Sequence, residues 1–342
     1  MANESIALYQ RVAQGRLRHL ATAAAYGSAG VTALGMLATG VVIGQALIAR
    51  RAFPIAEHPP PRCDGRYGFE HPGKPVRLAV LGDSSAAGYG VDAPRKTLGA
   101  LLAAGLAEQL KRPVDLHCVA VVGAQSRHLA PQIERLVDAD PPDLAVILIG
   151  GNDVTHRTNV PDAVRALGDA VRALRMMDTD VVVGTCPDMG AIAPIQPPLK
   201  WLAHRWSRQL AALQTVAVVE AGGRTVSLGD LLGPSFAADP ERMFAWDRFH
   251  PSADGYVAAA GVLLPSMVSA LAEPAGPRPA EPDGAGVRNL YAAAAKAAEQ
   301  TGTEVAPATV AGRERGPNGR WAHLRRRAWR SVGRPTDPAH VP

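Results

Sequence analysis

Hydrophobic and polar positions follow two alternating patterns between residues 76 and 272. Short apolar runs rich in β-branched residues end in Gly or a turn, and each predicts a buried strand. These runs are RLAVLGDS, VDLHCVAVVG, LAVILIGGND, DVVVGTCPD and RTVSL. Segments with apolar residues three or four positions apart lie between them and predict helices, the last one over residues 253–271. Strand and helix alternate about five times, so we expect an α/β domain in which helices cover both faces of a parallel sheet of about five strands.

An uncharged segment over residues 20–49 follows a basic N-terminal segment, residues 1–19. It is long enough to cross a bilayer core, which needs about 20 apolar residues. We therefore expect one transmembrane helix and a membrane-anchored, single-pass chain. A cleaved signal peptide and a buried or interfacial helix are the alternatives. Arginines at both ends leave the orientation open, and we favour an extracytoplasmic domain.

Two further segments differ in composition from the predicted domain. Residues 50–75 are rich in Pro, His and Gly, which predicts an extended linker. Residues 273–342 turn to Pro, Ala and Gly and lack enough large apolar residues for a core, so we expect a mostly disordered tail with one short Ala-rich helix over 286–299. Eight arginines with interleaved Trp and Leu over residues 313–334 predict a contact with anionic lipid or nucleic acid, and a solvated tail is the alternative.

Composition and charge narrow the possible functions. Hydrophobic residues make up 47% and charged residues 20% of the 342-residue chain, which argues against global disorder and against a polytopic membrane protein. The formal net charge is +5, but the tail carries 11 basic and 7 acidic residues, so the predicted domain is nearly neutral. Such a domain is a poor match for specific nucleic-acid binding, because phosphate contacts need a basic face.

The three cysteines show no CxxC motif and no Cys/His metal spacing. Cys63 lies in the predicted linker. Cys118 and Cys186 lie in apolar runs and are expected to be small buried side chains. A structural disulfide is the alternative.

The residues that follow the predicted strands carry the chemistry, because ligands bind beyond the carboxyl ends of an open parallel sheet. Ser84 follows the first strand, Gly123 the second and Asn152 the third, while Asp247 and His250 stand just before the last helix. Together they supply a hydroxyl, a flexible backbone amide, a side-chain amide donor, and an imidazole with a carboxylate three residues upstream. Acyl transfer through a serine requires these groups.

The four blocks GDS, VVGAQS, GGND and DRFHP resemble the SGNH hydrolases, the GDSL esterase and lipase superfamily, and stand in that family's order over residues 76–271. The resemblance implies a three-layer, flavodoxin-like α/β fold over residues 76–272. It implies that Ser84 is the nucleophile. One departure is the sequence GDSSAAG where many members have GDSL, which affects the shape of the pocket and leaves the nucleophile in place.

These residues predict a serine esterase that cleaves acyl esters through an acyl-enzyme. Ser84 needs a base within hydrogen-bond reach, and His250 can take its proton while Asp247 holds the imidazole. The N–H groups of Ser84 and Gly123 and the side chain of Asn152 are the expected donors to the oxyanion. No metal or cofactor is required. The alternatives are an acyltransferase or deacetylase acting on a cell-envelope glycan or lipid, which would use the same residues, and a membrane-tethered binding module without activity.

Apolar residues near the predicted reactive edge are candidates for the acyl pocket. Met189, Ile192 and Ile195 lie in the loop after the fourth strand, where they would form a wall or a partial lid. Trp246, beside the predicted carboxylate, is a further candidate, with a merely packed aromatic as the alternative. We expect Asp83 to support the turn after the first strand.

Overall fold

The computed structural model describes residues 39–41, 44–45, 58–137, 140–192, 196–229, 236, 239–272, 278–279, 289–310 and 313–315. The chain divides into two compact units, Met1–Ala52 and Phe53–Pro342. The described residues of the first unit are helical. Most of the expected transmembrane helix over residues 20–49 lies outside the described residues, as does the basic segment before it, and both stay predictions.

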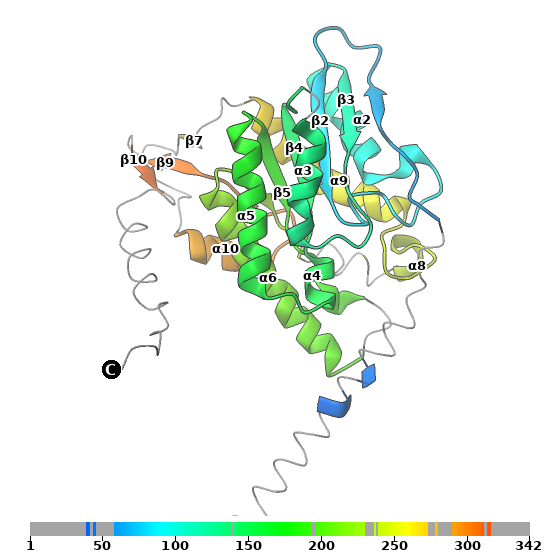
Figure 1. Cartoon of the computed structure of the whole chain (residues 1–342). Coiled ribbons are helices and arrows are strands. Elements are labelled where there is room, and N and C mark those ends of the chain that lie inside the picture. Colours follow the sequence, from blue (N-terminus) through cyan, green and yellow to red (C-terminus); the bar gives the residue numbers. More distant parts are fainter. Residues whose placement is uncertain are drawn as a thin grey trace, which may run out of the picture. The chain divides into compact units, whose positions relative to one another are not determined.

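A seven-stranded sheet forms the centre of the second unit (Figure 1). Its strands are β1 (Gly65–Tyr67), β2 (Val76–Gly82), β3 (Val114–Cys118), β4 (Leu144–Leu148), β5 (Asp180–Gly184), β6 (Arg224–Val226) and β8 (Glu304–Val305). Their order is β1-β3-β2-β4-β5-β6-β8. The strands from β2 to β6 pair in parallel, in the order typical of flavodoxin-like folds. The prediction of an α/β domain with about five parallel strands is confirmed.

Helices cover both faces of the sheet because its central strands bury side chains on both sides. The long helices are α2 (Leu98–Leu110), α3 (Leu129–Val137), α5 (Val160–Met176), α6 (Leu199–Glu220) and α9 (Ala253–Ala272). In β2, Leu78 and Val80 join the core formed with α2 and α9. Ala79 and Leu81 alternate with them and join the opposite core, formed with α3, α5 and α6, which lie together on one face in Figure 1. The domain therefore has three layers.

Among the described residues, α9 is the one helix long and apolar enough to cross a membrane by length and composition. It packs against α2, and its buried side chains Tyr256, Leu263 and Met267 belong to the core of the domain. Its bounds agree with the last helix predicted from the sequence. We therefore describe α9 as the helix that closes the domain.

Both edges of the sheet come from segments that the sequence analysis placed outside the domain. β1 lies in the expected linker and pairs antiparallel with β3. β8 lies in the expected tail and pairs antiparallel with β6, and α10 (Leu290–Ala298), inside the predicted Ala-rich helix, packs against α6. Strands of two or three residues show too little alternation to be recognised. The folded unit thus extends past residues 76–272 on both sides.

The remaining described elements are short. They are η1 (Pro94–Lys96), η2 (Ser126–His128), α4 (Gly151–Thr155), η3 (Met189–Ala191) and α8 (Pro240–Met243), with a second sheet of β7 (Arg278–Pro279), β9 (Ala308–Val310) and β10 (Arg313–Arg315). Three of them, η2, α4 and η3, follow β3, β4 and β5 at the carboxyl edge of the large sheet. Ligands bind at this edge in open parallel sheets.

Candidate active site

The turn that carries Ser84 begins at a position that accepts only glycine. Gly82 has a φ of +136°, and a Cβ built there would lie 1.9 Å from the carbonyl oxygen of Leu148. The next N–H, that of Asp83, donates to this same oxygen at 3.0 Å. Consecutive turns follow over residues 84–90, and the next α-helix starts only at Leu98.

Two buried glutamines fix the ends of the central strands. Gln132 of α3 accepts the N–H of Gly82 at 2.8 Å and donates to the Gly82 carbonyl at 2.9 Å. Gln214 of α6 accepts the N–H of Cys186 at 2.8 Å and donates to the Ile149 carbonyl at 3.0 Å. Each amide satisfies buried backbone groups, which would otherwise be costly. The sequence analysis missed both, because a single Gln in an amphipathic helix gives no local signal.

Ser84, His250 and Asp247 form a chain of hydrogen bonds. The Nε2 atom of His250 lies 2.7 Å from Ser84 Oγ, although the two residues are 166 positions apart. The Nδ1 atom of His250 lies 2.5 Å from Asp247 Oδ2. Because a carboxylate can only accept, Nδ1 carries the proton, and Nε2 of a neutral ring then accepts from the serine hydroxyl. The structure brings together the three residues that the sequence analysis grouped.

The Asp247 carboxylate is held in its charged form. Burial alone would raise its pKa, but the hydrogen bond and charge of His250 and the backbone N–H groups of Phe249 and His250, each 3.0 Å from Oδ1, outweigh burial. The net effect lowers the pKa of Asp247 below its ordinary value. The carboxylate can therefore orient the imidazole and stabilise a positive charge on it.

Aromatic rings flank the His250 imidazole. The Tyr89 ring lies 4.6 Å from it and the Phe249 ring 4.8 Å from it, both edge to face. Tyr89 is itself fixed, because the buried Tyr256 hydroxyl of α9 donates to its carbonyl at 2.6 Å. These contacts restrict the orientation of the imidazole. The sequence analysis did not assign Tyr89 a role, because a tyrosine between two glycines has no signature of its own.

Gly123 and Asn152 lie on neighbouring loops at the same edge. Gly123 has a φ of +79° in an exposed turn after β3. Asn152, in α4, donates through Nδ2 to the carbonyl of Ala124 at 3.0 Å. Within the described part of the chain, no hydrogen bond engages the backbone N–H of Ser84 or of Gly123. Both N–H groups therefore remain available to a ligand.

Two buried carboxylates support these loops. Asp153 of α4 accepts the N–H of Ser126 at 3.0 Å and its hydroxyl at 2.7 Å, which ties α4 to η2. Asp83 accepts the N–H of Ser85 at 3.0 Å, in agreement with its expected place in the turn. Burial raises the pKa of Asp83 to about 6. The sequence analysis missed the role of Asp153, which depends on a partner 27 positions away.

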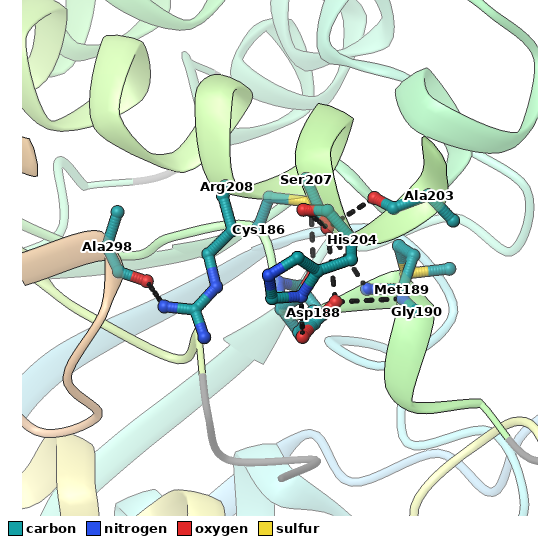
Figure 2. Close-up of polar contacts among 10 residues, drawn as sticks. Cys186, Asp188, Met189, Gly190, Ala203, His204, Ser207, Arg208 and Ala298 are labelled. Carbon is teal, nitrogen blue, oxygen red and sulfur yellow. Dashed lines mark hydrogen bonds and ion pairs between the residues drawn. The ribbon is translucent and has the colours of Figure 1, made fainter. Parts of the chain in front are cut away.

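Asp188 organises the loop after β5 (Figure 2). Its carboxylate accepts the N–H of Gly190 at 2.8 Å and Nδ1–H of His204 at 2.6 Å. Ser207, on the same helix as His204, accepts the N–H of Met189 at 3.3 Å. These contacts attach η3 to α6.

The four candidates for an acyl pocket have different environments. Met189 and Ile192 are buried and pack in a small core with residues of α6. Ile195 lies outside the described residues. Trp246 is 62% exposed, and its ring centroid is 6.4 Å from that of Tyr89. Met189 and Ile192 thus join the loop to α6, and their place in an acyl pocket stays a prediction.

One group of side chains in the described residues has the spacing of metal ligands. Glu70, His71 and Glu108 place three ligand atoms within 4.8 Å of one another. Lys111 already pairs with Glu108, and none of the three side chains contacts Ser84 or His250 in the described part of the chain. We assign no role in the candidate site to this group.

Known proteins resemble this chain in sequence and fold. The model of the GDSL-like Lipase/Acylhydrolase family matches residues 80–258. The GDSL-like esterase Rv1075c of Mycobacterium tuberculosis is 44% identical over 266 residues, which cover 74% of this chain and 83% of that protein. Among solved structures, Axe2, an acetylxylan esterase from Geobacillus stearothermophilus, is 19% identical over 57% of this chain and 95% of its own, with a TM-score of 0.44. LAE5, an alpha/beta hydrolase enzyme from the metagenome of Lake Arreo, is 19% identical over 57% and 96%, also with a TM-score of 0.44.

Proposed function

Because this chain belongs to the GDSL-like lipase/acylhydrolase family, we propose that it is a serine esterase that hydrolyses carboxylic esters through an acyl-enzyme. The observation that carries the proposal is the hydrogen-bond chain from Ser84 through His250 to Asp247. Family membership supports an ester as the substrate class, and this chain of hydrogen bonds supports a serine as the nucleophile.

In the first step Ser84 Oγ attacks the carbonyl carbon of the ester. His250 Nε2, 2.7 Å away, takes the hydroxyl proton as the C–O bond forms. The imidazole becomes positively charged, and the Asp247 carboxylate, whose pKa is lowered, stabilises that charge. The carbonyl oxygen becomes an oxyanion.

The oxyanion is stabilised by N–H donors at the carboxyl edge of the sheet. The backbone N–H groups of Ser84 and Gly123 have no partner among the described residues. Asn152 uses one N–H on Ala124 and keeps the other for a ligand. Donors that are already fixed in place stabilise developing charge without reorganisation.

In the remaining steps His250 returns its proton to the leaving alcohol and the acyl-enzyme forms. Water then attacks the acyl carbon, His250 takes a proton from the water, and Ser84 regains its hydroxyl as the acid leaves. If an alcohol of a sugar or lipid replaced water, the same residues would perform transfer. Product analysis with and without an acceptor alcohol distinguishes hydrolysis from transfer.

A fluorophosphonate probe tests the proposed nucleophile. We expect the wild-type chain to be labelled and the Ser84→Ala variant to be unlabelled and inactive towards a panel of acyl esters of increasing length. Ser85→Ala is the matched control, since its neighbouring hydroxyl makes no hydrogen bond with His250 in this structure, and it should still be labelled. Labelling of Ser84→Ala with retained activity would contradict the proposal.

We further propose that residues 20–49 anchor the chain in a membrane and that the arginine-rich segment 313–334 contacts anionic lipid. The uncharged length of the first segment and the charge of the second support these roles. A chain that begins at Pro54 should fractionate as a soluble, active esterase. If this shortened chain still bound anionic vesicles and lost the binding at high salt, the lipid contact would belong to the arginine-rich segment.

A further inference from the structure

Two cysteines face each other at the β1 edge of the sheet. β1 and β3 pair antiparallel, with Gly65 opposite Leu116 and Tyr67 opposite Val114. The ladder ends at Gly65, and its register, extended by two residues, would set Cys63 opposite Cys118, the last residue of β3. Directly opposed residues of an antiparallel pair have Cα atoms about 4.5 or 5.5 Å apart. Both distances fall within the range of about 4.4–6.8 Å that a disulfide spans.

Contacts beyond the ladder keep the two cysteine-bearing segments side by side. The N–H of Cys118 donates to Asp64 Oδ1 at 2.7 Å, so the two segments stay adjacent beyond β1 itself. Cys63 and Leu116 belong to one core, against which Cys118 also packs, so both sulfur atoms lie on the same face of the sheet. The interaction between the two side chains lowers the pKa of Cys63 and raises that of Cys118.

The thiol of Cys63 is prepared for exchange chemistry. The neighbouring Cys118 side chain lowers the pKa of Cys63 to about 7, against the opposing effect of burial. A thiolate, and not a thiol, is the nucleophile in thiol–disulfide exchange. Cys186 differs, because complete burial raises its pKa.

We propose that Cys63 and Cys118 are a redox pair that closes to a disulfide between β1 and β3. Two S–H bonds break and one S–S bond forms. The two electrons and two protons pass to a low-molecular-weight disulfide, such as oxidised glutathione, which leaves as two thiols. Cys118 is the partly exposed member of the pair, and Cys63 is buried.

The position of the pair gives the disulfide a structural effect. Cys118 Sγ lies 3.8 Å from the carbonyl oxygen of Ala86, two residues after Ser84. The bond would join residues 55 positions apart and so restrict the unfolded chain. It would also fix the short edge strand β1, which β3 alone holds in the sheet. We expect the oxidised chain to melt several degrees above the reduced chain.

Thiol counting on the native full-length chain tests the proposal. The chain is equilibrated at a series of reduced-to-oxidised glutathione ratios, quenched in acid, denatured, labelled with a maleimide and weighed. We expect two of the three thiols to be lost together as the ratio falls, with Cys186 labelled throughout. Peptide mapping should link residue 63 to residue 118, and reduction should restore both thiols and the lower melting temperature.

Cysteine variants and a denatured sample serve as controls. Cys186→Ser should still lose two thiols, whereas Cys118→Ser should form no internal bond. Incubation in denaturant should abolish the preference for the 63–118 link, since the native register creates it. The proposal is overturned if all three thiols are labelled under oxidising conditions. A stable glutathione adduct on one cysteine, or a link between two molecules, as the end product would overturn it equally.

Discussion

The described part of the domain contains two Asp–His pairs with almost the same hydrogen-bond length and different surroundings. Asp247 and His250 are joined at 2.5 Å, and Asp188 and His204 at 2.6 Å. The His250 side chain is 12% exposed and its second nitrogen faces Ser84 Oγ, whereas the His204 side chain is 52% exposed. An Asp–His pair acts as a base only where the second nitrogen faces a nucleophile, so the surroundings decide its use.

The serines beside the two pairs reinforce this difference. Ser84 directs its hydroxyl at an imidazole nitrogen. Ser207 donates to the carbonyl of Ala203 at 2.7 Å, and its oxygen accepts the N–H of Met189. The hydroxyl of Ser207 is thus engaged in hydrogen bonds with backbone groups of α6 and η3 (Figure 2). The second pair holds a loop in place.

Replacing the histidine of each Asp–His pair should give the largest difference in activity between the two pairs. In His250→Ala no base remains for Ser84, and we expect kcat to fall by about 10⁶, the scale seen when a triad histidine is removed. His204→Ala removes a half-exposed side chain and should leave kcat/KM within about twofold. Steady-state kinetics on one activated ester checks both variants. A comparable loss in both would show that the second pair takes part in catalysis.

Neutralising the carboxylate of each pair should give the next largest difference in activity. Asp247→Asn leaves the imidazole without the acceptor that sets its tautomer, and kcat should fall by about 10⁴. Asp188→Asn can still accept the N–H of Gly190. It should therefore lower activity by less than tenfold and unfolding free energy by about 1–2 kcal/mol. Kinetics and urea denaturation of the two variants would separate the roles.

Loss of an oxyanion donor should cost less than loss of the base. We expect Asn152→Ala to lower kcat by about 10²–10³ and to leave the shape of the pH profile unchanged, since His250 is intact. Asn159→Ala is the matched control, because Asn159 is exposed and its side chain makes no capping hydrogen bond. An altered pH profile in Asn152→Ala would instead indicate that Asn152 acts through the imidazole.

The carboxyls of Asp83 and Asp247 should give opposite dependences of stability on pH. The pKa of Asp83 rises from 3.8 to about 6 in the folded chain. Between these values the folded chain binds more protons than the unfolded chain, so the unfolding free energy falls as pH rises, by at most about 3 kcal/mol. Asp247, with a lowered pKa, stabilises the fold above its ordinary pKa and loses that contribution as pH falls.

The Asp83→Asn variant isolates the first of these contributions. We expect it to be more stable than wild type at pH 7 and no more stable at pH 4, as measured by urea denaturation at both values. Asn can still accept the N–H of Ser85 through its carbonyl oxygen. Equal stability differences at the two pH values would show that Asp83 does not titrate in this range.

The sequence predicted the central strands and long helices because these elements are buried on defined faces, which imposes a period on their residues. It also grouped Ser84, Asp247 and His250, since each stands at a strand end or before a helix. That grouping depended on the sequence motifs around the three residues, and the structure adds the distances between their side chains.

Other features depend on contacts between distant parts of the chain and leave no local pattern. β1 and β8 are too short to show alternation, and β8 is held in place by its pairing with β6. Asp153 and Tyr89 act through partners outside their own segments. Cys63 and Cys118 meet only through the register of β1 and β3. Met189 and Ile192 have the apolar character that was expected, but apolarity alone does not distinguish a wall of a pocket from a packed interior.

The two buried glutamines separate the nucleophile from the loops that surround it. Gln132 and Gln214 are carried by helices, and they hold backbone atoms at the last residues of the sheet before each loop departs. The loop segments beyond Ile149 and Cys186 can therefore be shortened, lengthened or exchanged without shifting Ser84. A library that varies only the loop between Cys186 and α6 would test whether substrate range can change on a constant catalytic frame.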